Sequence, residues 1–186
     1  MKRTRLIQNN PFSHFAVYVV DNIFDEEYRS QMLDVVKELT KTDKMNKSTN
    51  VKANMTSWFD LFEYEIFQPF FNSVIESAQT FYSLRACVPN EAFDYHLFEA
   101  WAMRHEKGDF TNMHTHGPST WSGVYYITIP DETVMTLPDF NHVELLQENS
   151  LYLFHSLVKH QVGIQNYEKP RYSIAFNIKQ EFLKNE

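Results

Sequence analysis

Short β-branched and aromatic segments recur from residue 93 to the end of the chain, and turn residues separate them. The first segment runs from Phe93 to Arg104 and ends just before the turn Lys107-Gly108-Asp109. The later segments are residues 113–116, 122–129, 133–137, 151–154 and 171–178. A series of short strands joined by turns is typical of an antiparallel sandwich or barrel. The C-terminal half is therefore predicted to be all β.

The N-terminal half has a different pattern, a strand followed by helices. Phe15–Val20 is rich in β-branched residues and ends at a turn signal, which predicts a strand. Asp25 is a suitable N-cap for a helix that extends to about Thr40, because apolar residues then recur at spacings of three and four. A second helical pattern covers residues 58–82, and Pro69 is expected to kink it or to begin a new helix.

Between the two helical patterns lies a polar stretch, residues 41–56, with four lysines and three asparagines. This stretch is expected to be an exposed loop. Extended to Trp58, it is a candidate lid over a binding site.

No repeat and no low-complexity linker divides the 186 residues, a length that fits one domain. We therefore expect a single domain over residues 1–186. Residues 1–92 would supply a strand and helical support, and residues 93–182 would form the β core. The predicted fold class is α+β, mainly β, with the helices packed on a sheet.

Composition excludes several classes of protein. Hydrophobic residues make up 43% of the chain and aromatic residues 16%, which is incompatible with intrinsic disorder. A single cysteine excludes a disulfide framework, a thiolate zinc cage and an iron–sulfur cluster within one chain. The net charge of −7 argues against nucleic acid as the main partner. No stretch approaches the roughly 20 apolar residues of a membrane span, and we expect a cytoplasmic protein.

The chain has eight histidines, and His114 and His116 flank a single threonine. On a strand alternate side chains share a face, so both imidazoles would point the same way, with their roots about 7 Å apart. Both rings could then reach one metal ion. The alternative is a pair of partly exposed histidines in the loop before Gly117-Pro118.

A third histidine, His160, follows the buried-strand pattern of residues 151–154. In a rolled antiparallel barrel, strands that are distant in sequence lie side by side, so His160 could complete a facial set with His114 and His116. Three ligands on one face leave open positions for substrate and oxygen, as in non-haem iron oxygenases. Imidazole also suits zinc, copper and nickel, so the ligand type alone does not select the metal.

Arg171 opens the last strand pattern, eleven residues after His160, and Ser173 would share its face. A guanidinium beside a hydroxyl is a suitable clamp for a carboxylate. The alternative is an edge-strand arginine whose charged end reaches water.

These features occur together in an order that resembles a known family. The stretch from Arg104 to Asn177 resembles the catalytic core of the Fe(II)/2-oxoglutarate-dependent dioxygenases, most closely the prolyl-hydroxylase-like branch and the small oxygenases of bacteria and phages. The matching elements, in order, are Gly108, His114-Thr-His116, Ser122-Gly-Val-Tyr-Tyr126, Ser150-Leu-Tyr-Leu-Phe154, His160 and Arg171-Tyr-Ser173.

The resemblance implies a double-stranded β-helix (jelly-roll) core with Fe(II) held by His114, His116 and His160. It further implies that 2-oxoglutarate chelates the iron and that its distal carboxylate is bound by Arg171, Ser173 and Tyr126. The implied reaction is hydroxylation of a small-molecule or peptide substrate, with release of succinate and CO2 and with ascorbate as an additive in vitro.

The chain departs from the family pattern at His116 and at Phe154-His155-Ser156, where relatives usually have Phe-Pro-Ser. His116 stands where the better-known members carry a carboxylate, and Asp109 or Asp139 would be the candidate carboxylates if His116 were not a ligand. His105 and Arg104 fall near a position where relatives often have a tyrosine that contacts the cosubstrate, and the alignment does not choose between them.

Two other functions fit parts of the pattern. One is a cupin-type three-histidine iron dioxygenase that does not use 2-oxoglutarate, and Arg171 would discriminate it from the first interpretation. The other is a jelly-roll binding module without catalysis. In the 2-oxoglutarate-dependent interpretation Trp101, Tyr125 and Trp121 are candidates for part of the apolar wall of the site, with plain core packing as the more usual role for each aromatic residue.

Overall fold

The fold is that of a computed structural model and is described for residues 1–8, 15–42, 50–84, 90–130 and 132–183. Its strands form two antiparallel sheets. The seven-stranded sheet has the order β1 (Arg3–Ile7), β2 (Val17–Asp21), β10 (Ser150–His155), β7 (Trp121–Thr128), β12 (Arg171–Phe182), β5 (Phe93–His105) and β4 (Asn54–Met55). The five-stranded sheet has the order β3 (Val51–Lys52), β6 (Phe110–His114), β11 (His160–Val162), β8 (Val134–Leu137) and β9 (His142–Leu145).

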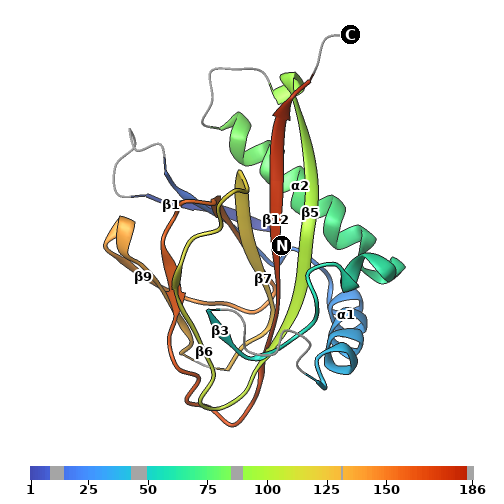
Figure 1. The fold of residues 1–186 in the computed structure, drawn as a ribbon, viewed down its shortest axis with the longest axis vertical. Helices are drawn as coiled ribbons and strands as arrows, with labels where there is room; N and C mark the ends of the chain where they lie inside the picture. Colours follow the sequence, from blue (N-terminus) through green and yellow to red (C-terminus); the bar gives the residue numbers. More distant parts are fainter. Residues whose placement is uncertain (9–14, 43–49, 85–89, 131, 184–186) are drawn as a thin grey trace.

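The sheets and helices form three layers (Figure 1). Helices α1 (Glu26–Leu39) and α2 (Gln68–Ser83) cover the outer face of the seven-stranded sheet. A core of buried residues such as Phe70, Tyr125 and Phe176 joins these two layers. A second core, which includes Val124 and Met135, joins the seven-stranded sheet to the five-stranded sheet. The expected jelly-roll core with helices on one face is confirmed.

Both helices begin where the sequence indicates. The Asp25 carboxylate accepts a hydrogen bond from the Tyr28 backbone N–H at 2.8 Å, which caps the first turn of α1. Pro69 lies in the first turn of α2, where its missing N–H costs no helical hydrogen bond. The preceding residues, 60–67, form two short 3-10 helices rather than an early part of α2. Among the described residues, no helix combines the length and apolarity needed to cross a membrane.

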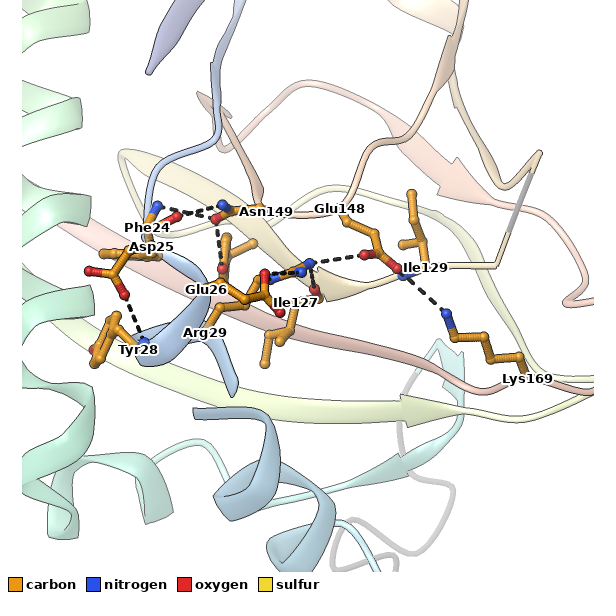
Figure 2. Close-up of polar contacts among 11 residues, drawn as sticks. Phe24, Asp25, Glu26, Tyr28, Arg29, Ile127, Ile129, Glu148, Asn149 and Lys169 are labelled. Atoms are coloured by element: carbon orange, nitrogen blue, oxygen red, sulfur yellow. Dashed lines mark hydrogen bonds and ion pairs between the residues drawn. The ribbon is translucent and has the colours of Figure 1, made fainter. Parts of the chain in front are cut away.

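Polar side chains fasten the start of α1 to the seven-stranded sheet (Figure 2). The Asn149 side chain forms two hydrogen bonds with the backbone of Phe24. Its Oδ1 accepts from the Phe24 N–H at 3.1 Å, and its Nδ2 donates to the Phe24 carbonyl at 2.6 Å. Arg29 donates to the Ile127 carbonyl at 3.2 Å and pairs with Glu148 at 2.9 Å. These contacts fix the helical layer on the face of the sheet that does not carry the histidines.

The polar stretch expected to be an exposed loop is partly sheet. Residues 51–52 form β3 on the five-stranded sheet, and residues 54–55 form β4 on the edge of the seven-stranded sheet. Met55 and Thr56 are buried, and Thr56 exchanges hydrogen bonds with the backbone of Ala102. The expectation failed here because polar side chains are compatible with short edge strands, which pair with a neighbouring strand on one side only. The remainder of the candidate lid, residues 43–49, lies outside the described residues.

The long pair β5–β12 places side chains in a row along the inner face of the seven-stranded sheet. The paired residues on this face, from one end to the other, are Arg171 with His105, Ser173 with Met103, Ala175 with Trp101, and Asn177 with Glu99. On the neighbouring strand β7, the backbone of Gly123 lies so close to the next strand that no side chain fits. A Cβ there would lie 2.3 Å from the Tyr152 carbonyl oxygen.

Candidate metal centre

Three histidines from separated parts of the chain meet between the two sheets. His114 ends β6 and His160 begins β11, and these two residues are direct partners in the antiparallel pairing of the strands. His116 lies beyond the end of β6, in a loop whose position is fixed by a 2.8 Å hydrogen bond from its N–H to the Ser156 carbonyl. The expected strand 113–116 thus begins three residues after the start of the observed strand and ends two residues beyond it, yet both rings still point to one centre.

The ring nitrogens are close and their lone pairs converge. His116 Nε2 is 3.0 Å from His114 Nε2 and 3.3 Å from His160 Nε2. His114 Nδ1 donates to the Asn112 carbonyl at 2.8 Å, and His160 Nδ1 donates to the Val158 carbonyl at 3.0 Å. A neutral imidazole has one N–H, so in both rings Nε2 carries the lone pair. This is how metal-binding histidines are oriented in proteins.

Burial keeps the three rings neutral. It lowers the pKa of His114, lowers that of His116 to about 3, and holds that of His160 well below its usual value. The neighbouring rings oppose protonation of His116 and His160 in addition. Neutral imidazole is the form that binds a metal ion.

The donor set fits a divalent metal ion. The three ligand atoms lie within 4.8 Å of one another, and three imidazoles on one side leave open positions opposite them. The alternative carboxylates point elsewhere: Asp109 accepts a hydrogen bond from the Glu106 N–H, and Asp139 accepts one from the Lys159 N–H. In the described part of the chain, neither joins the group of three histidines.

A cavity next to the histidines contains the buried side chain of Arg171. Arg171 is 1% exposed, and its Nε and Nη1 atoms have no hydrogen-bond partner. Burial lowers the pKa of this arginine, whereas Tyr126 and Asp109 act in the opposite direction. A buried guanidinium with free N–H groups is costly, so this end of the cavity is chemically suited to an anion.

Ser173 and Tyr126 line the same cavity, and they are direct partners in the pairing of β12 with β7. The Ser173 hydroxyl is buried without a partner. Burial raises the pKa of Tyr126 to about 12, so its hydroxyl stays protonated and able to donate. The structure therefore brings together all six residues proposed from the sequence, because all of them line this one cavity. They are His114, His116, His160, Arg171, Ser173 and Tyr126.

A second, larger cavity of about 350 Å³ opens on the other side of the histidines. His114, His116, Trp101 and Val51 line both cavities. The outer cavity also has Glu99, Asn177 and Trp58 in its wall. A metal ion on the histidines would thus stand between an inner, arginine-lined space and an outer, acidic and aromatic space.

Comparison with known proteins agrees with this arrangement. Residues 99–149 match the model of a family described as "Putative 2OG-Fe(II) oxygenase". A search of curated proteins gives no match. Among solved structures, a Pseudomonas putida prolyl-4-hydroxylase superposes with a TM-score of 0.65 at 12% identity, over 88% of this chain and 91% of that one. The chain has the 2-oxoglutarate–Fe(II) oxygenase fold.

Two further structures with the oxygenase fold are similar to this chain. The viral collagen prolyl hydroxylase of Paramecium bursaria Chlorella virus-1, solved with 2-oxoglutarate, gives a TM-score of 0.61 at 10% identity over 87% of this chain and 94% of that one. HygX of Streptomyces hygroscopicus, solved with nickel, 2-oxoglutarate and hygromycin B, gives 0.61 at 11% identity over 88% and 82%. The family resemblance expected from residues 104–177 is confirmed.

Within this oxygenase fold, two of the three candidate wall residues have their other expected role and pack in the core. Tyr125 is fully buried in the core beneath the helices, and Trp121 packs against the same core. Both stand on β7 at positions that point away from the histidines, because alternate residues of a strand face opposite sides. Trp101 is the correct wall residue, and its ring centre lies 6.2 Å from that of His116.

Sequence reasoning left His105 undecided and missed Glu99. The structure pairs His105 with Arg171 at the inner end of the cavity, while Arg104 turns outward to Glu106. Strand alternation from Trp101 could have indicated both residues, since positions 99, 101, 103 and 105 share one face.

His105 leads to a prediction about acid sensitivity. The ring is buried, and burial together with Arg171 holds its pKa well below the usual value. The unfolded chain takes up this proton near pH 6.5 but the folded protein does not, so stability is lost as the pH falls below 6.5. Below pH 6.5, we expect a buried histidine that stays neutral in the folded state to lower the free energy of unfolding of the metal-free protein. The decrease should be about 1.4 kcal/mol per pH unit.

Urea unfolding of metal-free protein at several pH values between 7.5 and 5 measures this slope. The free energy of unfolding of His105→Gln should fall less steeply with decreasing pH than that of the wild type. The difference in slope should equal the contribution of one histidine. His96→Gln is the matched control, because His96 is exposed. Equal slopes for the wild type and His105→Gln would contradict the prediction.

Proposed function

We propose that this protein is an Fe(II)- and 2-oxoglutarate-dependent dioxygenase that hydroxylates a small-molecule or peptide substrate. One observation carries the proposal: three convergent imidazole nitrogens share one cavity with a buried guanidinium that has two unpartnered nitrogens. A metal ion satisfies the first group and a carboxylate satisfies the second. A dicarboxylate whose other end chelates the metal satisfies both at once.

The protein side of the reaction is positioning. His114, His116 and His160 would hold iron, and the Nδ1 hydrogen bonds of His114 and His160 keep two of these rings oriented. When bound, iron and 2-oxoglutarate supply the oxidative decarboxylation to succinate and CO2 that is coupled to hydroxylation of a substrate C–H bond.

Arg171 would bind the distal carboxylate through two N–H groups, which fixes the cosubstrate in one orientation. Ser173 and protonated Tyr126 each have a hydroxyl that can donate to the same carboxylate. The apolar neighbours Met103, Val124 and Ala175 line the cavity and limit the entry of water.

The outer cavity is where we place the substrate, since it reaches His114 and His116 from the side opposite Arg171. One similar structure is a prolyl hydroxylase of Trichoplax adhaerens solved in complex with a peptide fragment, and another is HygX solved with hygromycin B. These two ligands support a hydroxylase that acts on a peptide or a small molecule.

Formation of succinate from 2-oxoglutarate tests the proposed function. Protein incubated with Fe(II), oxygen and ascorbate should release succinate above a no-enzyme control, and addition of substrate pools should raise the rate. Omission of iron or chelation with EDTA should abolish the signal. Iron-dependent oxygen consumption without use of 2-oxoglutarate would instead indicate a cupin-type dioxygenase, and failure to bind iron would indicate a binding module.

A further inference from the structure

We propose that the outer cavity recognises its substrate through a cationic nitrogen, an ammonium or guanidinium group, that pairs with Glu99. The inference rests on the proposed function, because it assigns the outer cavity to the substrate. It adds the chemical class of that substrate and the residue that selects it.

The charge of the cavity wall is the first argument. Glu99 is the single carboxylate among the described residues that line the outer cavity, and none of those residues is lysine or arginine. In the described part of the chain, no lysine or arginine forms an ion pair with Glu99 either. The negative charge at the cavity wall therefore has no ion-pair partner among the described residues and is open to a cationic ligand.

Glu99 is held in place before any ligand arrives. Asn177 Nδ2 donates to Glu99 Oε2 at 2.6 Å, and the buried Ser122 hydroxyl donates to Asn177 Oδ1 at 2.6 Å. This chain of hydrogen bonds orients one carboxylate oxygen and leaves the other for the cavity. A preorganised acceptor binds a cation at a smaller cost in side-chain entropy than a mobile surface glutamate.

The surroundings of Glu99 also suit a cationic group. Trp58 and Trp101 line the same cavity, and aromatic faces attract ammonium and guanidinium ions. Trp101 is 7% exposed, and its Nε1–H has no hydrogen-bond partner. This indole can therefore donate to an oxygen of the same ligand. A substrate that bears both a cationic nitrogen and a nearby carbonyl or hydroxyl satisfies the two groups.

The row of side chains on β5 and β12 separates the two ligands by charge. Arg171 and its strand partner His105 lie at one end of the row, and Glu99 lies six residues away along β5. The three histidines face the middle of the row, near Trp101. The dianionic cosubstrate is attracted to the arginine end and repelled from the glutamate end. A cationic substrate has the opposite preference, so each ligand is directed to its own side of the metal.

The test uses full-length protein loaded with Mn(II) and 2-oxoglutarate without oxygen, so that binding is measured without turnover. The probes are the blocked tripeptides Ac-Gly-Xaa-Gly-NH2 in which Xaa is lysine, arginine, acetyl-lysine or glutamate, titrated by calorimetry. We expect the lysine and arginine peptides to bind about tenfold or more tighter than the acetyl-lysine peptide, and the glutamate peptide to bind most weakly.

Glu99→Gln keeps the acceptor for Asn177 and removes the charge, so this variant should reduce the preference for lysine over acetyl-lysine to about twofold or less. Glu27→Gln, an exposed residue on α1, is the matched control and should retain the full preference. Equal affinities for lysine and acetyl-lysine in the wild type would overturn the inference, as would an absence of binding by both cationic probes. Failure of 2-oxoglutarate itself to bind would count against the proposed function instead.

Discussion

Arg171→Met is expected to abolish 2-oxoglutarate binding without destabilising the metal-free protein. The guanidinium is buried with two nitrogens unpartnered, so its removal breaks no hydrogen bond at those atoms. Replacing a buried charge by an apolar side chain of similar volume is neutral or stabilising, by about 1 kcal/mol or more. Binding should weaken about a hundredfold or more, because the distal carboxylate of 2-oxoglutarate then loses its charged partner.

Arg29 offers the opposite case in the same chain. This arginine pairs with Glu148 and donates to the Ile127 carbonyl, so its side chain is fully used by the fold (Figure 2). We therefore expect Arg29→Met to lower the unfolding temperature and to leave 2-oxoglutarate binding unchanged. Thermal unfolding and calorimetric titration of Mn(II)-loaded protein measure the two properties. An Arg171→Met protein that unfolds at a lower temperature than the wild type would show that Arg171 stabilises the fold. One that binds 2-oxoglutarate as the wild type does would show that Arg171 does not bind its carboxylate.

Sequence patterns identify which residues meet at the candidate site better than they identify the strands that carry them. Spacing and order, together with the family resemblance, single out His114, His116 and His160 as candidate ligands, and the structure brings their ligand atoms within 4.8 Å of one another. The local structure around them was less accessible. His116 lies outside the strand expected to contain it, and it is positioned by a backbone hydrogen bond to Ser156 that no local pattern reports.

The edge strands show a second limit of sequence patterns. Val51–Lys52 and Asn54–Met55 are strands of two residues each, and Arg3–Ile7 is a charged edge strand. Strands this short or polar lack the alternation that identifies longer strands. They are formed by pairing with partners far along the chain, as Asn54 pairs with Arg104. The same long-range pairing places Glu99 beside Asn177, which explains why the outer cavity could not be predicted.

His160→Ala is expected to abolish metal binding, with an effect as large as that of Arg171→Met on the cosubstrate. Loss of one of three imidazoles should weaken Fe(II) or Mn(II) affinity by at least about a hundredfold. This is more than the usual effect of changing a residue that only hydrogen-bonds to a metal ligand. Wild-type protein should gain thermal stability when Mn(II) is added, and the variant should not. His142→Ala is the matched control, since His142 pairs with Glu144 on β9 instead of joining the centre.

His116 allows a sharper version of the same test. His116→Ala removes a ligand atom and should lose metal as His160→Ala does, whereas His116→Asp supplies the carboxylate that better-known relatives use at this position. The aspartate adds a negative charge next to the metal ion, which favours Fe(II) electrostatically, so His116→Asp should bind Fe(II) at least as tightly as the wild type. If His116→Ala instead binds metal as the wild type does, then the close approach of its Nε2 to those of His114 and His160 reflects packing, and the metal must be held by other groups.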